Sequence, residues 1–160
     1  MRIEPARHET EPDSAGQTPA ITIRGFIHGI TYPMHRFFLF FAALGAFIGV
    51  GLGAFGAHGL RQVLTEAQMA TYRTGVEYQM WHSLGMGLIG MLAERFPGQR
   101  LLHWAGGLML GGIALFSGSL YLLSLTGQRW LGMVTPFGGM AFIAAWLLLA
   151  IAALRLPRAP

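Results

Sequence analysis

Five polar side chains stand near the point where the first long apolar stretch of the chain ends and the second begins. They are His58, Glu77, Tyr78, Gln79 and His82. Two imidazoles from neighbouring membrane helices can ligate a haem iron or hydrogen-bond the carbonyl of a quinone, with the tyrosine and the amide close by. The pattern requires no cofactor, but haem or a quinone is the kind that this candidate polar cluster would suit.

A structural interpretation of the same residues competes with this chemistry, and it is the one that we favour. Polar side chains in helical membrane proteins commonly hydrogen-bond from one helix to another. On this interpretation His82 joins two helices and His58 caps the end of the first. Glu77 would pair with Arg73, four residues earlier on the same helix face, or with Arg61.

Catalytic motifs are missing from the sequence. It contains no Gly-x-Ser-x-Gly nucleophile elbow, no His-Glu-x-x-His zinc helix, no phosphate-binding loop and no cysteine. Ser117, Ser119 and Tyr121 could line a polar path, but serines in membrane helices usually bond to their own carbonyls or across to a neighbour. We therefore assign no catalytic residue and no metal ligand, which leaves an enzyme unsupported.

The composition is that of a membrane protein. Hydrophobic residues make up 53% of the 160 residues and charged residues only 11%, against roughly 25% charged residues in an ordinary soluble domain. The basic residues are arginines scattered singly between apolar runs, so they form no basic face for a nucleic acid. The expected partner of the whole chain is the lipid bilayer.

The chain divides into a polar tail and an apolar domain. Residues 1–33 are expected to form a largely disordered tail and a short segment before the membrane, because they are too polar to form a core. Residues 34–156 are expected to form an all-α, four-transmembrane-helix bundle, since the apolar runs match a hydrocarbon layer of about 30 Å. The predicted spans are approximately 37–57, 76–95, 103–126 and 133–154.

Local signals mark the helix ends. Thr65 and Gln68 have the spacing of a capping box, which predicts a helix start whose first turns form an amphipathic portion at the membrane surface. The sequence Phe96-Pro97-Gly98 should break that helix, and Thr135-Pro136 should supply a cap and a first helical residue.

Glycines recur at helical spacing in two of the spans. A row of small residues lets another helix approach closely, as in known membrane helix pairs. The expected helix-packing glycines are Gly45, Gly49 and Gly53 in the first span and Gly107, Gly111 and Gly118 in the third.

Arginines near the span ends predict the orientation of the chain. With four spans, one side of the membrane carries Arg24, Arg36, Arg95, Arg100, Arg155 and Arg158, and the other carries Arg61, Arg73 and Arg129. Cytoplasmic loops carry the excess of basic residues. Both termini are therefore expected in the cytoplasm.

Four patches of sequence resemble a known family. They are Gly53-Ala54-Phe55-Gly56-Ala57-His58-Gly59-Leu60, Thr74-Gly75-Val76-Glu77-Tyr78-Gln79-Met80-Trp81-His82, Phe116-Ser117-Gly118-Ser119-Leu120-Tyr121 and Thr135-Pro136-Phe137-Gly138-Gly139. The chain resembles the domain of unknown function 423 family of small bacterial inner-membrane proteins, which is related to the mitochondrial transmembrane protein 256. The resemblance covers roughly Met34 to Leu154 and implies a multipass inner-membrane protein of four helices with no assigned activity.

Three functional hypotheses remain open from the sequence. The preferred one is a non-catalytic bundle that packs with itself, as a homo-oligomer, or with a larger membrane complex through its glycine faces. The second is a haem- or quinone-binding electron-transfer module that uses His58 and His82. The third is a small transporter or lipid-handling protein, which the absence of a polar midplane disfavours.

Overall fold

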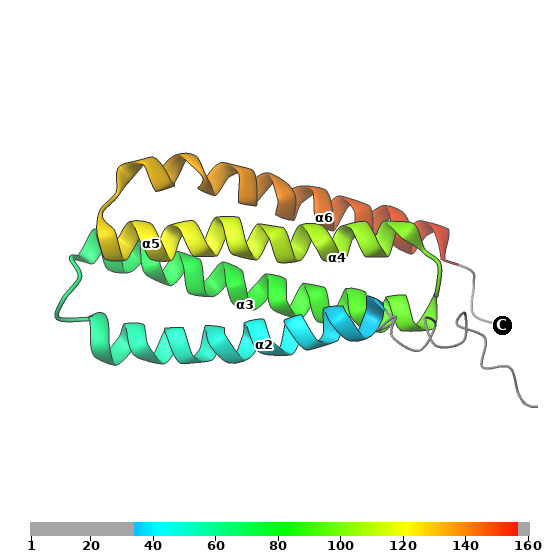
Figure 1. The fold of residues 1–160 in the computed structure, drawn as a ribbon, viewed down its shortest axis with the longest axis horizontal. Helices are drawn as coiled ribbons and strands as arrows, with labels where there is room; N and C mark the ends of the chain where they lie inside the picture. Colours follow the sequence, from blue (N-terminus) through cyan, green and yellow to red (C-terminus); the bar gives the residue numbers. More distant parts are fainter. Residues whose placement is uncertain (1–33, 157–160) are drawn as a thin grey trace, which may run out of the picture. The chain divides into compact units, whose positions relative to one another are not determined.

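The chain is described by a computed structural model for residues 34–156, and within this part it is helical almost throughout (Figure 1). The elements are α2 (Met34–Phe55), the π-helical η1 (Gly56–Leu60), α3 (Glu66–Arg95), α4 (Arg100–Gly112), the π-helical η2 (Ile113–Ser117), α5 (Gly118–Thr126), the 3-10 helix η3 (Arg129–Met133) and α6 (Thr135–Arg155). The all-helical prediction is thus confirmed for the described part. The predicted tail at 1–33 lies outside the described residues.

Three helical stretches of the described part are long and apolar enough to cross a membrane. They are Met34–Leu60, Arg100–Thr126 and Arg129–Arg155, each of 27 residues. Helices α4, η2 and α5 form one continuous rod, which explains the length of the second stretch (Figure 1). Helix α3 is longer, at 30 residues, but it is less apolar than these stretches and is not among them.

The structure confirms two of the predicted helix ends and corrects a third. The capping box at the start of α3 is present, with Gln68 N–H donating to Thr65 Oγ1 at 3.3 Å and Thr65 N–H donating to Gln68 Oε1 at 3.0 Å. Helix α3 ends at Arg95, before the predicted break, where Gly98 has a φ of +89°. Pro136 does lie in the first turn of α6, but Thr135 makes no capping bond, because its hydroxyl faces the Ser119 hydroxyl of α5 instead.

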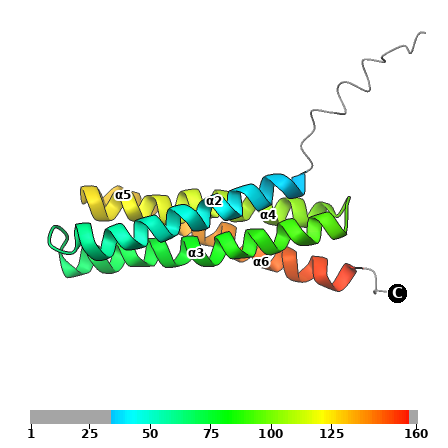
Figure 2. The same cartoon turned by 90° about the horizontal axis from the view of Figure 1, so that it is seen from below.

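Helix α3 is the central element of the bundle. It packs along α2 on one side and against α4, η2 and α5 on the other, and α6 packs against α4 and η2 (Figures 1 and 2). Helix α2 meets α4 near its beginning, where the Phe38 ring occupies the space left by the missing side chain of Gly106. Beyond this point α2 depends almost entirely on α3 for its contacts.

The outer surface of the bundle is apolar, as expected for helices surrounded by lipid. Phe47 in α2 is 76% exposed, Ile143 in α6 is 71% exposed and Leu154 near the end of α6 is 88% exposed. Side chains of this size would be strongly disfavoured in water. The larger buried cluster joins the first turns of α2 with α3, α4 and α6, and its Met86, Leu102 and Met109 are fully buried.

Close contact between α6 and the π-helical η2 requires Gly138. A Cβ atom on Gly138 would meet the backbone nitrogen and Cα of Phe116, and backbone atoms cannot move aside cheaply. Overpacking of this kind costs about 1–3 kcal/mol. We therefore expect Gly138→Ala to lower the free energy of unfolding by about this amount.

The adjacent glycine provides the control for this prediction. A Cβ on Gly139 would lie 3.7 Å from the Phe116 ring, which is an ordinary contact. Thermal unfolding of Gly138→Ala and Gly139→Ala in the same detergent measures the difference. Equal midpoints for the two variants would contradict the close approach of α6 to η2.

Candidate functional site

Two side chains of α3 hydrogen-bond to backbone carbonyls of α2. The Tyr72 hydroxyl donates to the Leu52 carbonyl at 2.9 Å, and Gln79 Nε2 donates to the Gly45 carbonyl at 2.7 Å. Such bonds need the two helix backbones to lie close together, and glycines on α2 permit this. The two bonds fix the register of the antiparallel pair.

Three glycines of α2 face α3. A Cβ on Gly45 would lie 2.5 Å from Ser83 Oγ, and a Cβ on Gly49 would lie 2.6 Å from Met80 Sδ. Gly53 is less tightly covered, because a Cβ there would lie 3.5 Å from Val76 Cγ1.

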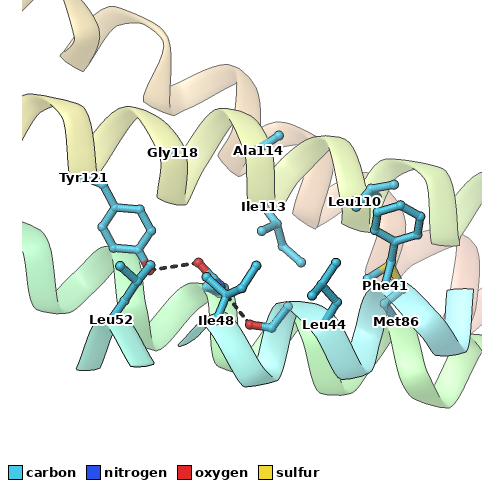
Figure 3. Close-up of a pocket in the computed structure, with 12 residues that line it drawn as sticks. Phe41, Leu44, Ile48, Leu52, Met86, Leu110, Ile113, Ala114, Gly118 and Tyr121 are labelled. Carbon is cyan, nitrogen blue, oxygen red and sulfur yellow. Dashed lines mark hydrogen bonds between the residues drawn. The ribbon is translucent and has the colours of Figure 1, made fainter. Parts of the chain in front are cut away.

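Gln79 also connects α3 to α5. The Tyr121 hydroxyl donates to Gln79 Oε1 at 2.9 Å, so that a single amide is bonded to both α2 and α5 (dashed lines in Figure 3). The Gly45 carbonyl can only accept, which requires the amide nitrogen to face it and turns the amide oxygen toward Tyr121. Gly75 leaves room for the Tyr121 ring, since a Cβ there would lie 2.9 Å from that ring.

His82 packs against α6. Its ring stacks on Phe142 with centroids 3.4 Å apart and an angle of 14° between the planes, and it is only 7% exposed. His82 Nδ1 lies 2.6 Å from the Tyr78 carbonyl of its own helix and donates to it, because a carbonyl oxygen only accepts. The His82 side chain therefore joins α3 to α6 by ring stacking, whereas the sequence predicted a hydrogen bond between helices. Because Nδ1 is used within α3, Nε2 is the one ring nitrogen left to bind a ligand.

His58 and His82 do not lie at a common depth. His58 is exposed in η1, at the far end of α2. In the register set by Gln79 and Tyr72, the start of α3 at Glu66 lies level with His58. His82 follows sixteen residues later, which is about 24 Å along the helix at 1.5 Å per residue. The positions of the two histidines in the sequence were compatible with a similar depth, but the structure places them apart. This geometry provides no pair of axial ligands for one haem.

Glu77 and Tyr78 face away from the Gln79 bonds. Glu77 is exposed on the outside of α3, and no ion pair within 4 Å joins it to Arg73 or Arg61 in the described part of the chain. Glu77 and Arg73 instead line a shallow pocket of about 260 Å³ beside Gly53. The Tyr78 ring stacks on Phe116 at 4.4 Å.

The five predicted residues thus lie in separate places. The polar side chains that do hydrogen-bond between helices at the centre of the bundle form a different set from the predicted one. This polar centre consists of Gln79 with Tyr121 and, about two helical turns away on α3, Tyr72. Tyr121 was noted only for a possible polar path. The tyrosines could have been found as the partners of Gln79, since a buried amide in lipid needs both a donor and an acceptor.

Two of the four serines in the described part hydrogen-bond as predicted. Ser119 Oγ donates to the Phe116 carbonyl and Ser124 Oγ to the Tyr121 carbonyl, each at 2.9 Å. Two others, Ser83 and Ser117, are fully buried, and their hydroxyls find no partner among the described residues. The described residues also include no group of three or more His, Asp or Glu side chains able to hold a metal ion.

The glycines predicted to pack in the third span contact nothing within the described part of the chain. A Cβ added to Gly107, Gly111 or Gly118 would find no atom within 4 Å. They share one face of the α4–η2–α5 rod, and Ala114, also exposed, lies between Gly111 and Gly118 on it. This set is called the open glycine face below.

Comparison with known proteins bears directly on these features. The family described as "Protein of unknown function (DUF423)" matches residues 52–139, which include η1, Gln79, His82 and Tyr121. The chain belongs to this family. The UPF0382 membrane protein YwdK of Bacillus subtilis is 44% identical over 120 residues, covering 75% of this chain and 98% of that protein.

Two further DUF423 relatives extend the comparison. A UPF0382 membrane protein of Staphylococcus epidermidis is 45% identical over 120 residues, covering 75% of this chain and 97% of the relative. The UPF0382 inner membrane protein YgdD of Escherichia coli K12 is 43% identical over 124 residues, covering 77% of this chain and 93% of YgdD. No solved structure matches the chain. The protein is thus a member of a membrane protein family of unknown function, built from several apolar helices.

The bond between Tyr121 and Gln79 should contribute measurably to stability. Tyr121→Phe removes the hydroxyl and leaves Gln79 Oε1 without its donor in an apolar setting. Hydrogen bonds between membrane helices contribute about 0.6 kcal/mol on average and up to about 1.7 kcal/mol. We expect the free energy of unfolding to fall by about 1 kcal/mol, as measured by chemical unfolding in mixed micelles.

Tyr78→Phe is the matched control, because the Tyr78 hydroxyl makes no hydrogen bond within the described residues and its ring stacking would persist. It should change stability little. If both variants lost the same stability, Tyr121 would have no special role at Gln79.

Proposed function

We propose that the chain is a non-catalytic inner-membrane protein of four spans that associates with a second copy or with a larger membrane complex. The observation that carries this proposal is the open glycine face. Glycine in a membrane helix gives up side-chain packing, and it compensates for this loss only where another helix comes close. Gly45 and Gly49 gain that compensation inside the chain, whereas Gly107, Gly111 and Gly118 would gain it from a partner.

Helix α3 serves as the fourth span in this proposal. At 30 residues it is about 45 Å long, more than enough for a hydrocarbon layer of about 30 Å. Its neighbours α2 and the α4–η2–α5 rod belong to stretches that qualify as spans by length and composition. A helix packed between two spans over most of its length shares their surroundings.

In this proposal the register of α3 against α2 sets the depth at which α3 enters the membrane. Its polar first turns lie alongside the end of α2 and η1, so they extend the bundle instead of forming a separate surface segment. That end, from Gly51 through η1, contains four glycines and the exposed His58. Polar turns at Glu66 and Arg73 therefore fit the end of the bundle near the outer interface.

Association should depend on the open glycine face. Leucines at Gly107 and Gly111 would fill the space that a neighbouring helix needs, without touching any atom of their own chain within 4 Å of the new Cβ. We expect Gly107→Leu with Gly111→Leu to weaken self-association in liposomes by about tenfold or more, measured by energy transfer between labelled copies. If the partner is instead a larger complex, the same double variant should reduce the amount of partner that co-purifies with the protein in mild detergent.

The control is Gly51→Leu, which fills an equally open position on a different helix, α2. This variant should associate like the natural protein. A protein that remained monomeric, copurified with no reproducible partner and was insensitive to Gly107→Leu with Gly111→Leu would refute the proposal.

Orientation gives a separate prediction. Arg36, Arg95, Arg100 and Arg155 lie at one end of the bundle, and Arg61, Arg73 and Arg129 lie toward the other (Figure 1). Because basic residues favour the cytoplasmic side, both termini should be cytoplasmic. A green fluorescent protein fused to the carboxyl terminus should fluoresce, and alkaline phosphatase in its place should stay inactive; the reverse pattern would contradict this orientation.

A further inference from the structure

A lateral groove runs between α2 and the α4–η2–α5 rod, with α3 as its floor. Its volume is about 360 Å³, and it is open on one side (Figure 3). It exists because α2 stays close to α4 only around Phe38 and Gly106 and then depends on α3 alone. In a membrane, the open side of this groove faces the acyl chains.

The two ends of the groove differ in polarity. Figure 3 shows Tyr121 and Leu52 at one end, and Phe41, Met86 and Leu110 at the other. Along α2 the groove extends over twelve residues, from Phe41 to Leu52, which corresponds to about 16 Å. None of the residues that line the groove carries a charge. The groove is therefore shaped for a neutral, elongated molecule with one polar end.

Between its two ends, level with Gly45, the groove offers a hydrogen-bond donor that the chain does not use. A glutamine amide has two N–H groups, and one of them donates to the Gly45 carbonyl. The second has no acceptor among the described residues, although Gln79 is only 5% exposed and lines the groove. An N–H group without an acceptor is costly in lipid, where no water can replace the missing bond.

We propose that this groove binds a neutral, lipid-soluble molecule that has a carbonyl oxygen at the head of a hydrocarbon chain. The carbonyl accepts the second N–H of Gln79, beside Tyr121, and the chain lies along α2 toward Phe41 and Met86. An anionic or cationic head is disfavoured, since the groove contains no counter-charge. His58 and His82 take no part, as neither lines the groove.

Two sources can supply this chemistry in a membrane: an isoprenoid quinone and a neutral glyceride. Decylubiquinone and 1-monoolein represent them, and decylbenzene has a comparable tail without the carbonyl. Native mass spectrometry of the protein released from micelles, titrated with each probe, gives the stoichiometry and the dissociation constant. At least one carbonyl probe should bind one-to-one, more tightly than decylbenzene, and the tighter of the two identifies the source.

Variants on α2 and α3 test the location of the site. Ile48→Trp fills the groove, whereas Val50→Trp places the same ring two residues away at an exposed position that does not line the groove. Binding should fall more than tenfold in the former and be retained in the latter. Gln79→Leu should weaken a carbonyl probe about tenfold and leave decylbenzene unchanged, since only the carbonyl uses the amide.

Each of these outcomes decides the question. Absence of binding by both carbonyl probes, or equal binding by Ile48→Trp and the natural protein, would overturn the proposal. Ile48→Trp keeps the test valid even if Gln79→Leu, which also loses the bonds to α2 and α5, fails to fold. Ala114 and Gly118 belong both to the groove and to the open glycine face, but Gly107 and Gly111 do not line the groove. The variant Gly107→Leu with Gly111→Leu therefore tests the association separately from ligand binding.

Discussion

The fold depends on one constraint: a buried polar amide in the middle of α3 has to find its partners inside an apolar bundle. Gln79 meets it by donating to a backbone carbonyl of α2 and accepting from a tyrosine of α5. Only a closely approaching backbone presents such a carbonyl, and glycine at positions 45 and 49 makes that approach possible. The close contact and the hydrogen bond therefore support each other, and together they set the register of α2 against α3.

Local features of the sequence were sufficient to predict the elements of the fold. The long uncharged runs, the capping box at Thr65 and the break after Arg95 depend on neighbouring residues alone, so each could be predicted without tertiary contacts. Register could not, because it arises between helices. Without it, the separation of His58 and His82 in depth by about four helical turns could not be predicted.

The same limit applies to the glycines and to the polar centre. Periodicity identifies a face of a helix but not the neighbour of that face, so Gly45 and Gly107 looked equivalent in the sequence, although only the former packs within the described chain. Gln79 was found as part of a polar cluster, yet its partner Tyr121 lies 42 residues away. What the structure adds is a centre built of neutral groups, with the ionisable Glu77 and Arg73 kept on the outside.

Helix α2 has one substantial neighbour, α3, so beyond its first turns it can move without disturbing the other helices. A helix that is longer than the local hydrocarbon layer relieves the mismatch by tilting. In this bundle Phe38 and Ala42 hold the first turns of α2 in the larger buried cluster, whereas the rest of the helix has α3 as its main neighbour. A change in the tilt of α2 would therefore change the width of the opening beside it, away from Phe38.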